Sequence, residues 1–361
     1  MKESDFILPK YEPTIEKGKL SWRAASNIAL IKYWGKKGRQ IPANPSLSLS
    51  LESCATTTTL GYTPLENSAN NFSYDLVFEN KPNLDFRPKI DEFLLRIEPF
   101  LPFLKRFHFE IDTFNSFPHS SGIASSASAF AALSLCLLDM ERQMNKSMED
   151  DFFYKKASFL ARLGSGSASR SIQGPLMQWG HQSGIKGSTD LYAIPYPNEV
   201  HPVFETYRDV ILLVDRGSKT VSSTLGHSLM QGHVYSEQRF EQAQSNIVKL
   251  KEVLKKGDLD GFIEIIESEA LSLHAMMMTS IPYFILMKPN TVAIIQKVWD
   301  YRLQSGLHLG FTLDAGANVH LLFPEKEETE IYKFINEELV EYCEQGEILK
   351  DKAGSGSRKL S

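Results

Sequence analysis

A run of small and hydroxyl side chains stands between a segment of alternating polarity and a segment of strong helix formers. Small side chains let backbone N–H groups approach phosphate oxygens, and the following helix adds its positive dipole end. The candidate phosphate contacts are Pro118, Ser121, Gly122, Ala124, Ser125, Ser126 and Ser128, and Ser126 is also the candidate ligand of Mg²⁺. These residues alone leave a second interpretation equally open, a Ser-rich helix N-terminus with ordinary capping interactions.

Three charged residues have local contexts that suit catalysis. Lys32 lies in the apolar run from Ile28 to Trp34, where a purely structural ammonium would be costly without a partner for its charge. Arg170 follows a Gly/Ser-rich stretch and can clamp a carboxylate through two hydrogen bonds, although this pattern alone favours a surface ion pair. Asp314 could accept a proton from a bound hydroxyl, and a turn-capping aspartate is an equally good interpretation of that position.

Apolar periodicity predicts the elements that must hold these residues. Phenylalanines that alternate with polar neighbours predict a strand over 105–112, directly before the Ser-rich run. After that run, apolar residues at helical spacing predict a helix that continues to about Met144. A second helix is predicted to begin at a capping box formed by Ser147 and Asp150 and to end at Gly164.

The second half of the chain is predicted to be rich in helices. The expected elements are a strand over 210–214, a helix ending at a C-capping Gly257, helices over 259–277 and 291–305, and two strands within 310–323. A tight turn at Ala315-Gly316 would join the last two strands and place Asp314 at a strand end. Trp34 and His274 are interpreted as packing residues, since no second metal ligand stands near His274 at a suitable spacing.

Length and composition restrict the class of protein. With 361 residues and 42% hydrophobic content, the chain can form two lobes. A net charge of −5, with no basic patch interleaved with aromatics, argues against nucleic-acid binding. No apolar run reaches the roughly 20 residues that span a bilayer, and the N-terminus lacks the apolar core of a secretory signal. Three widely spaced cysteines without a C-x-x-C pair favour a reducing, cytoplasmic location, and residues 353–361 predict a mobile tail.

Other common catalytic signatures are missing from the sequence. It contains no G-x-x-x-x-G-K-[ST], no H-R-D with D-F-G, and no G-x-G-x-x-G after a predicted strand. P-loop, protein-kinase and Rossmann interpretations therefore have no local support. The hydrolase signatures H-E-x-x-H and G-x-S-x-G are missing as well.

Four ordered segments resemble the GHMP kinases and, within them, most closely the mevalonate diphosphate decarboxylases. They are Asn27-Ile-Ala-Leu-Ile-Lys-Tyr-Trp-Gly-Lys36 with its continuation Pro45-Ser-Leu-Ser48, the loop Pro118–Ser128 with its Ala124-Ser-Ser core, Gly164–Ser171, and Asp314-Ala-Gly-Ala-Asn318. Because they extend from residue 27 to residue 318, the resemblance covers nearly the whole chain. The sequence departs from the family pattern at His119 and Ser120, where the family has two small residues, and at Ala317, where it has Pro.

This resemblance implies an α+β, two-lobed GHMP-kinase fold. A ribosomal-protein-S5-like N-terminal domain that binds ATP would cover 1–205, and an α/β C-terminal domain would cover 206–361. The implied reaction is the ATP-dependent decarboxylation of mevalonate 5-diphosphate to isopentenyl diphosphate through 3-phosphorylation, in the mevalonate route of isoprenoid biosynthesis. The implied assembly is a homodimer.

The resemblance also implies roles for individual residues. Asp314 would accept or orient the proton of the substrate's tertiary hydroxyl, Lys32 would align charge between Asp314 and the transferred phosphoryl group, and Arg170 would hold the substrate carboxylate. The implied substrate contacts are Tyr33, Lys36, Ser165, Ser167 and Ser223. The cofactors would be ATP and Mg²⁺, held by the Ser-rich loop.

Related activities remain open from the sequence. A mevalonate 5-phosphate decarboxylase or a mevalonate 3-kinase would keep the same fold and change the substrate or the outcome. A catalytically silent paralogue would bind nucleotide and a partner protein without turnover. The combination of Lys32, Arg170 and Asp314 favours decarboxylation over both phosphorylation alone and silence.

Overall fold

The computed structural model describes residues 1–8, 15–118, 123–217 and 223–361. Within them, the first sheet has eight strands in the order β14-β1-β4-β7-β5-β6, with β8 paired to β4 and β9 paired to β8. Its strands are β1 (Gly18–Ile31), β4 (Ser46–Pro64), β5 (Ser73–Phe78), β6 (Lys81–Pro82), β7 (Phe107–Asn115), β8 (Leu176–Trp179), β9 (Ile194–Pro195) and β14 (Arg358–Lys359). A separate short hairpin joins β2 (Lys36–Gly38) to β3 (Ile41–Pro42).

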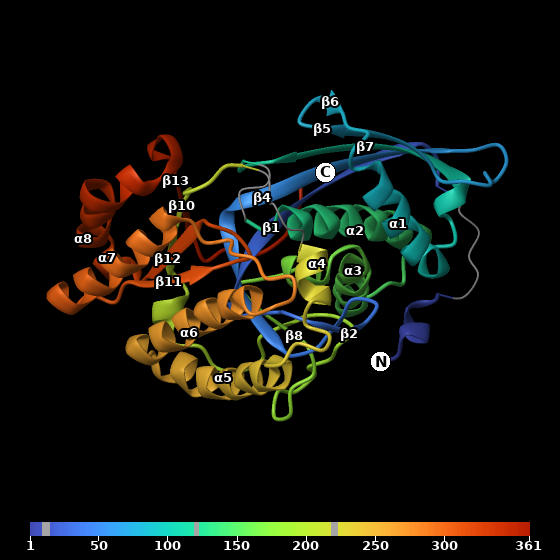
Figure 1. Ribbon diagram of the computed structural model, residues 1–361. Coiled ribbons are helices and arrows are strands. Elements are labelled where there is room, and N and C mark those ends of the chain that lie inside the picture. The colour runs from blue at the N-terminus through green and yellow to red at the C-terminus, as the bar shows by residue number, and fades with distance from the viewer. Residues whose placement is uncertain (9–14, 119–122, 218–222) are drawn as a thin grey trace.

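Helices cover one face of this first sheet. They are α1 (Arg87–Ile97), α2 (Ser125–Met144) and α3 (Asp150–Gly164), which lie together under the long strands in Figure 1. In β7, Phe107, Phe109 and Ile111 are buried while alternate residues are more exposed, which agrees with the predicted half-buried strand. Their side chains pack against apolar residues of α2 and α3 in one cluster that forms the core of this lobe.

The second half forms a smaller sheet with helices beside it. The strand order is β11-β12-β10-β13, all antiparallel. The strands are β10 (Arg208–Leu212), β11 (Gly310–Leu313), β12 (Val319–Phe323) and β13 (Ile348–Lys352), and the helices are α4 (Ser223–Ser228), α5 (Ser236–Lys256), α6 (Leu259–Met278), α7 (Pro289–Ser305) and α8 (Glu328–Phe334). Gly257 ends α5 in a left-handed conformation, as predicted, and β11 and β12 form the predicted hairpin. Among the described residues, no helix combines the length and apolar character that crossing a bilayer requires.

Two helix starts differ from the predictions. The helix α2 begins at Ser125, inside the Ser-rich run and earlier than predicted. The prediction placed the start too late because the first turn is mostly serine, which apolar periodicity does not detect. The helix α3 begins at Asp150, and the hydroxyl of Ser147 donates instead to the side chain of Asn145 at 2.7 Å. The predicted capping box is therefore wrong: local hydrogen bonding by Ser147 competes with helix capping.

The prediction of a mobile tail at the C-terminal end is also wrong. After β13 the chain passes close to the first sheet, and β14 pairs with β1 at Trp22 and Arg23. The close approach requires glycine: a Cβ at Gly354 would lie 2.6 Å from the backbone nitrogen of Glu52, and Gly356 has a φ of +95°. Glycine, which suggested flexibility in the sequence, here permits tight backbone packing.

Candidate active site

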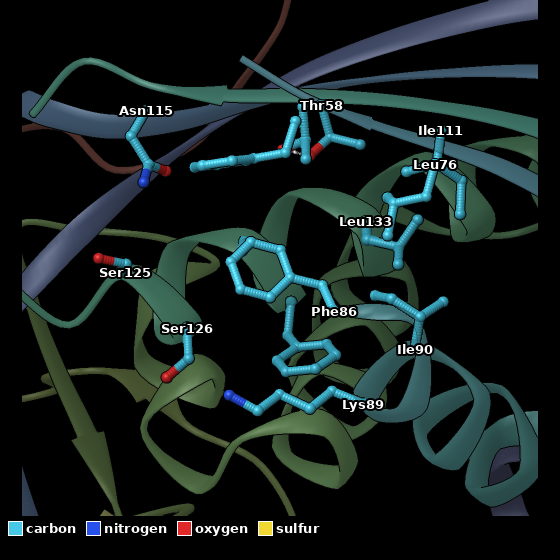
Figure 2. A pocket seen from close by; sticks show the side chains of 14 residues that line it. Thr58, Leu76, Phe86, Lys89, Ile90, Ile111, Asn115, Ser125, Ser126 and Leu133 are labelled. Atoms are coloured by element: carbon cyan, nitrogen blue, oxygen red, sulfur yellow. Dashed lines mark hydrogen bonds between the residues drawn. The ribbon is translucent and has the colours of Figure 1, made fainter. Parts of the chain in front are cut away.

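The N-terminus of α2 lies beside a largely apolar cavity of about 100 Å³. The cavity is enclosed by α1, α2 and strands β4, β5 and β7 (Figure 2), with Leu76, Ile90 and Ile111 among its apolar walls. Figure 2 shows Ser125, Ser126 and the ammonium end of Lys89 on one side of it. Ala124, the residue before the helix, has a left-handed conformation with φ +48°. An apolar slot beside a helix N-terminus suits a flat base joined to phosphates.

Three serines predicted to contact ligands lie close together next to this helix end. The hydroxyl oxygens of Ser126 and Ser165 are 3.4 Å apart, and those of Ser165 and Ser167 are also 3.4 Å apart. Ser126 is exposed, so its hydroxyl can reach a ligand. Ser128 has a different environment, because its hydroxyl is buried and lies 2.6 Å from that of Thr56. Its side chain therefore stabilises the first turns of α2 from the interior.

The remaining contacts predicted in the Ser-rich loop, and Ser223, lie at or beyond the limits of the described segments. Pro118 lies at the edge of the described segment, and Ser121 and Gly122 fall outside the described residues. Ser223 is the first residue of α4.

Lys32, Arg170 and Asp314 meet in one cluster, although they come from three distant parts of the chain. Lys32 follows β1, Arg170 lies in a short helical turn after α3, and Asp314 follows β11. The charge of Asp314 acts on both cations, since it raises the pKa of Lys32 and that of Arg170. Lys32 and Arg170 are 1% and 3% exposed, whereas Asp314 is only partly buried, so the cluster is open to solvent on the side of its acid. The structure therefore brings together the three charged residues that the resemblance assigns to one site.

The two cations keep hydrogen-bonding capacity in reserve. Among the described residues, the ammonium of Lys32 and the Nε of Arg170 are buried without hydrogen-bond partners. The Nη1 of Arg170 donates to the hydroxyl of Ser46 at 2.8 Å, which fixes the orientation of its guanidinium. Buried donors of this kind are costly unless a ligand accepts from them, so the cluster is suited to an anion.

Burial brings the pKa of Lys32 close to physiological pH. Burial lowers this pKa to about 8, Asp314 and Glu269 oppose the shift, and Arg170 adds to it. Burial likewise lowers the pKa of Arg170 to about 10, against the charge of Asp314. Lys32 is thus charged below about pH 8 and neutral above it, while Arg170 stays charged at neutral pH.

This difference predicts a pH profile. If the charged ammonium of Lys32 is required, kcat/KM should fall as the pH rises through about 8. The corresponding limb in kcat should lie at higher pH, because a bound anionic substrate favours the ammonium form. Steady-state kinetics between pH 6 and about 9.5 would measure both limbs. A kcat/KM that stays flat across this range would exclude a role for the charge of Lys32.

The backbone of Lys32 is held by residues from the second half of the chain. Its N–H donates to Glu269 at 2.9 Å, and Glu269 forms an ion pair with Arg239 and accepts from Asn246 at 2.8 Å. On the other side, the carbonyl of Lys32 accepts from the side chain of Asn44 at 2.9 Å. None of these residues is predicted from the sequence. The available signal was the charge of Glu269 among the mostly apolar buried residues of α6.

His274 has a more specific role than the packing role predicted for it. It is buried on α6, and its Nε2 lies 3.1 Å from the backbone carbonyl oxygen of Asp314. Burial lowers the pKa of His274 to about 4, so the ring is neutral near pH 7 and Nε2–H donates to the carbonyl. His274 therefore positions the Asp314 turn from behind. A histidine in an apolar helix stripe gives no sign of such a contact in the sequence.

Of the predicted substrate contacts Tyr33 and Lys36, Tyr33 lies near Arg170 of the charged cluster, and Lys36 lies near His227. The ring of Tyr33 packs on Trp179 with centroids 4.7 Å apart, and its hydroxyl is buried without a partner among the described residues. Burial raises the pKa of Tyr33, against the charge of Arg170. Burial lowers the pKa of Lys36, which is partly exposed at the start of β2. Trp34 is 4% exposed and is a packing residue, as predicted.

Comparison with known families gives two adjoining matches. Residues 24–192 match the model of the diphosphomevalonate decarboxylase-like N-terminal domain, and residues 209–359 match that of the mevalonate 5-diphosphate decarboxylase C-terminal domain. The chain is 30% identical over 327 residues to diphosphomevalonate decarboxylase mvd1 of Aspergillus fumigatus, covering 84% of this chain and 76% of that protein. It is 28% identical over 320 residues to the diphosphomevalonate decarboxylase of Rattus norvegicus, covering 82% and 74%.

Solved structures resemble this chain along nearly its full length. The mevalonate diphosphate decarboxylase of Staphylococcus aureus is 27% identical, with a TM-score of 0.81 over 97% of this chain and all of that one. A structure described as MDDEF in complex with MVAPP, AMPPCP and magnesium is 27% identical, with a TM-score of 0.81 over 96% of this chain and 99% of that one. The predicted two-lobed α+β fold is thereby confirmed.

Proposed function

The chain belongs to the diphosphomevalonate decarboxylase family, and we propose that its cleft converts mevalonate 5-diphosphate and ATP to isopentenyl diphosphate, ADP, phosphate and CO₂. The supporting observation is the meeting of an acid, a guanidinium and an ammonium in one cluster whose two cations are buried. These are the three charges that phosphorylation followed by loss of CO₂ requires. Within the family, this reaction belongs to the mevalonate route of isoprenoid biosynthesis.

In the first step, Asp314 acts on the tertiary hydroxyl. Its carboxylate accepts the hydroxyl proton as the oxygen forms a bond to the γ-phosphorus of ATP, and ADP leaves with the electrons of the broken P–O bond. Lys32 stabilises the negative charge that spreads over the transferred group. His274 keeps the Asp314 turn in place through the hydrogen bond to its backbone carbonyl oxygen. Apart from the proton transfer, the protein contributes to this step by positioning the reactants and stabilising charge.

In the second step, phosphate leaves the tertiary carbon with the electrons of the C–O bond. The carbon-carbon bond to the carboxylate then breaks, its electrons form the new double bond, and CO₂ departs. Arg170 holds the carboxylate in a bidentate clamp so that this bond is aligned with the empty orbital. Because the two cations of the cluster are buried, water has little access to an electron-deficient carbon held beside them.

The residues at the start of α2 fit ATP and Mg²⁺. The apolar cavity receives the base, and the N-terminus of α2 beside it attracts the phosphates. Mg²⁺ typically takes a few protein oxygens together with phosphate oxygens and water, so the exposed hydroxyl of Ser126 beside Ser165 is a suitable ligand. When bound, Mg²⁺ neutralises charge on the phosphates. Among the described residues, no cluster of His, Cys, Asp or Glu offers a stronger metal site.

The cavity assignment predicts a selective effect on nucleotide binding. Ala129 lines the cavity on α2, and Ala129→Leu would fill part of the space with three more carbons while keeping a good helix former. We expect the KM for ATP to rise about tenfold, whereas the KM for the acid substrate should change little. Isothermal titration with a non-hydrolysable ATP analogue would measure the loss directly. Unchanged nucleotide affinity would mean that the base binds elsewhere.

A CO₂-release assay tests the proposed function against its alternatives. Purified protein is incubated with MgATP and either mevalonate 5-diphosphate or mevalonate 5-phosphate, and CO₂ and ADP are measured together. We expect one CO₂ per ADP with the diphosphate. Preference for the monophosphate would identify a mevalonate 5-phosphate decarboxylase, and ADP without CO₂ would identify a 3-kinase. Nucleotide binding without either product would identify a silent paralogue.

We also propose a homodimer in the cytoplasm, built from two domains over 1–205 and 206–361. The first family match ends at residue 192 and the second begins at residue 209, which supports a domain boundary between them.

Exposed apolar side chains near the end of α6 support the proposed contact between two copies of the chain: Met278, Ile281, Tyr283 and Ile285. All three cysteines are free and buried, which fits a reducing compartment. Light scattering at several protein concentrations would measure the mass of the assembly.

A further inference from the structure

His227 lies inside the candidate active site, and the mechanism above gives it no role. It belongs to α4 and is 7% exposed. Its Nδ1 accepts a hydrogen bond from the backbone N–H of Gly35 at 3.0 Å. The imidazole ring lies against Tyr33 and Trp34, with centroid distances of 4.3 and 4.6 Å. Both the orientation and the position of the ring are therefore fixed.

The hydrogen bond from Gly35 also determines the proton position on this imidazole. A backbone N–H can only donate, so Nδ1 carries a lone pair and the proton of the neutral ring is on Nε2. Burial lowers the pKa of His227 to about 3, and the charges of Lys36 and Arg170 add to this effect. The ring is thus a neutral donor at physiological pH. Nδ1 is used to hold the turn at Gly35, and Nε2–H is left for another partner.

The neighbours of the ring identify the kind of partner. The charges that act on His227 are those of Lys36, Asp314 and Arg170, in decreasing order of effect. Among the described residues, the hydrogen bond from Gly35 to Nδ1 is the one that the ring makes, and none involves Nε2. The hydroxyl of Tyr33, whose ring packs on that of His227, is buried without a partner among the described residues. Two such donors beside the cations Lys36 and Arg170 form a site for an anion with several oxygens.

We propose that Nε2–H of His227 donates a hydrogen bond to a phosphoryl oxygen at the 5-position end of the acid substrate. This proposal rests on the proposed function and adds a specificity residue to it. The phosphoryl end is chosen over the carboxylate because His227 packs on Tyr33 and is affected most by Lys36, whereas the fork of Arg170 suits the carboxylate. A neutral donor among cations adds direction to their attraction, because it favours an oxygen at one position.

Two amide substitutions separate ligand binding from structural support. In His227→Asn the amide oxygen can take the place of Nδ1 and accept from Gly35, but nothing replaces Nε2–H. In His227→Gln the longer amide can place an N–H near Nε2, but the acceptor for Gly35 is lost. We expect His227→Asn to bind mevalonate 5-diphosphate about tenfold more weakly than wild type, which is the usual loss for a hydrogen bond to a charged group. His227→Gln should stay within about threefold of wild type.

The measurements are isothermal titration with mevalonate 5-diphosphate and, as a control, with a non-hydrolysable ATP analogue. Affinity for the analogue should be unchanged in both variants. Thermal unfolding should show the opposite order, with His227→Asn as stable as wild type and His227→Gln less stable. If the Asn variant binds the diphosphate normally while the Gln variant does not, His227 only supports the turn at Gly35 and the proposal is overturned.

The titration also separates this proposal from the proposed function. A wild-type protein that binds the diphosphate but releases no CO₂ would refute decarboxylation, and the comparison of Asn with Gln would still decide the role of His227. A wild-type protein that does not bind the diphosphate would refute both. Normal turnover with equal diphosphate affinity in all three proteins would refute only the assignment of His227.

Discussion

Replacing Asp314 with Asn is expected to lower kcat about a thousandfold while leaving the affinity for both substrates within a few-fold of wild type. Asn keeps the size of the side chain and leaves the carbonyl contact with His274 intact, because that contact uses the backbone of residue 314. What is lost is the group that accepts the hydroxyl proton. Loss of the negative charge also removes an interaction that keeps Lys32 protonated, so the basic limb of the pH profile should move to lower pH.

A matched substitution elsewhere separates catalysis from folding. Asp139 is buried in the first lobe, where it accepts from Trp22 at 2.9 Å and pairs with Lys359 at 2.8 Å. Asp139→Asn makes the same chemical change and should reduce stability while leaving kcat near wild type. Rapid-quench measurement of ADP in one turnover would report the phosphoryl step itself. Single-turnover rates of Asp314→Asn close to wild type would remove Asp314 from the chemistry.

Replacing Lys32 with Met should lower kcat by about two to four orders of magnitude and change nucleotide affinity little. The ammonium stabilises charge that develops during transfer, so its loss affects the transition state more than the bound ground state. Stability should respond in the opposite direction. The folded pKa of about 8 lies below the ordinary lysine value of 10.5, so the buried charge destabilises the fold most below pH 8. Lys32→Met should therefore raise the unfolding temperature by roughly 2 to 5 °C at neutral pH.

Lys156 provides the matched control for this change. It is equally buried, but its ammonium pairs with Glu141 at 2.7 Å and donates to the carbonyl of Phe100 at 3.0 Å. Lys156→Met leaves the carboxylate of Glu141 without its cation, which typically costs about 3 to 5 kcal/mol. Catalysis per folded molecule should be retained. Lys32→Met should thus lower activity and raise stability, whereas Lys156→Met should keep activity and lower stability. A lower unfolding temperature for Lys32→Met would mean that the ammonium of Lys32 has a partner in the free protein.

The charged cluster could be predicted because each member stands within a segment that resembles the family. Local pattern alone singles out Lys32, a charge in an apolar run, but it leaves a turn-capping role for Asp314 equally open and favours a surface ion pair for Arg170. Glu269 and His274 could not be assigned in the same way. Glu269 contacts the backbone of Lys32, more than two hundred residues away in the sequence, and His274 contacts the backbone of Asp314, about forty residues away. Contacts with a distant backbone leave no pattern in the local sequence.

Whether a fold element could be predicted also depended on whether its cause is local in the sequence or involves a distant segment. The strand at Phe107 and the helix ending at Gly257 are determined by periodicity and a C-capping glycine, and both were predicted. The start of α2 was missed because three of the four residues in its first turn are serines and only Ala127 is apolar. Residues 353–361 were misjudged because glycine has two uses, conformational freedom and close backbone contact, and composition does not distinguish them.

The pairing of β14 with β1 has a consequence for the order of synthesis and folding. The N–H of Ser21 donates to the carbonyl of Ser361 at 3.1 Å, and that of Leu360 donates to the carbonyl of Ser21 at 2.8 Å. One border of the N-terminal sheet thus stays unprotected until residues more than three hundred positions downstream have emerged from the ribosome. A nascent chain that ends before this point exposes a free strand edge, which is a template for self-association.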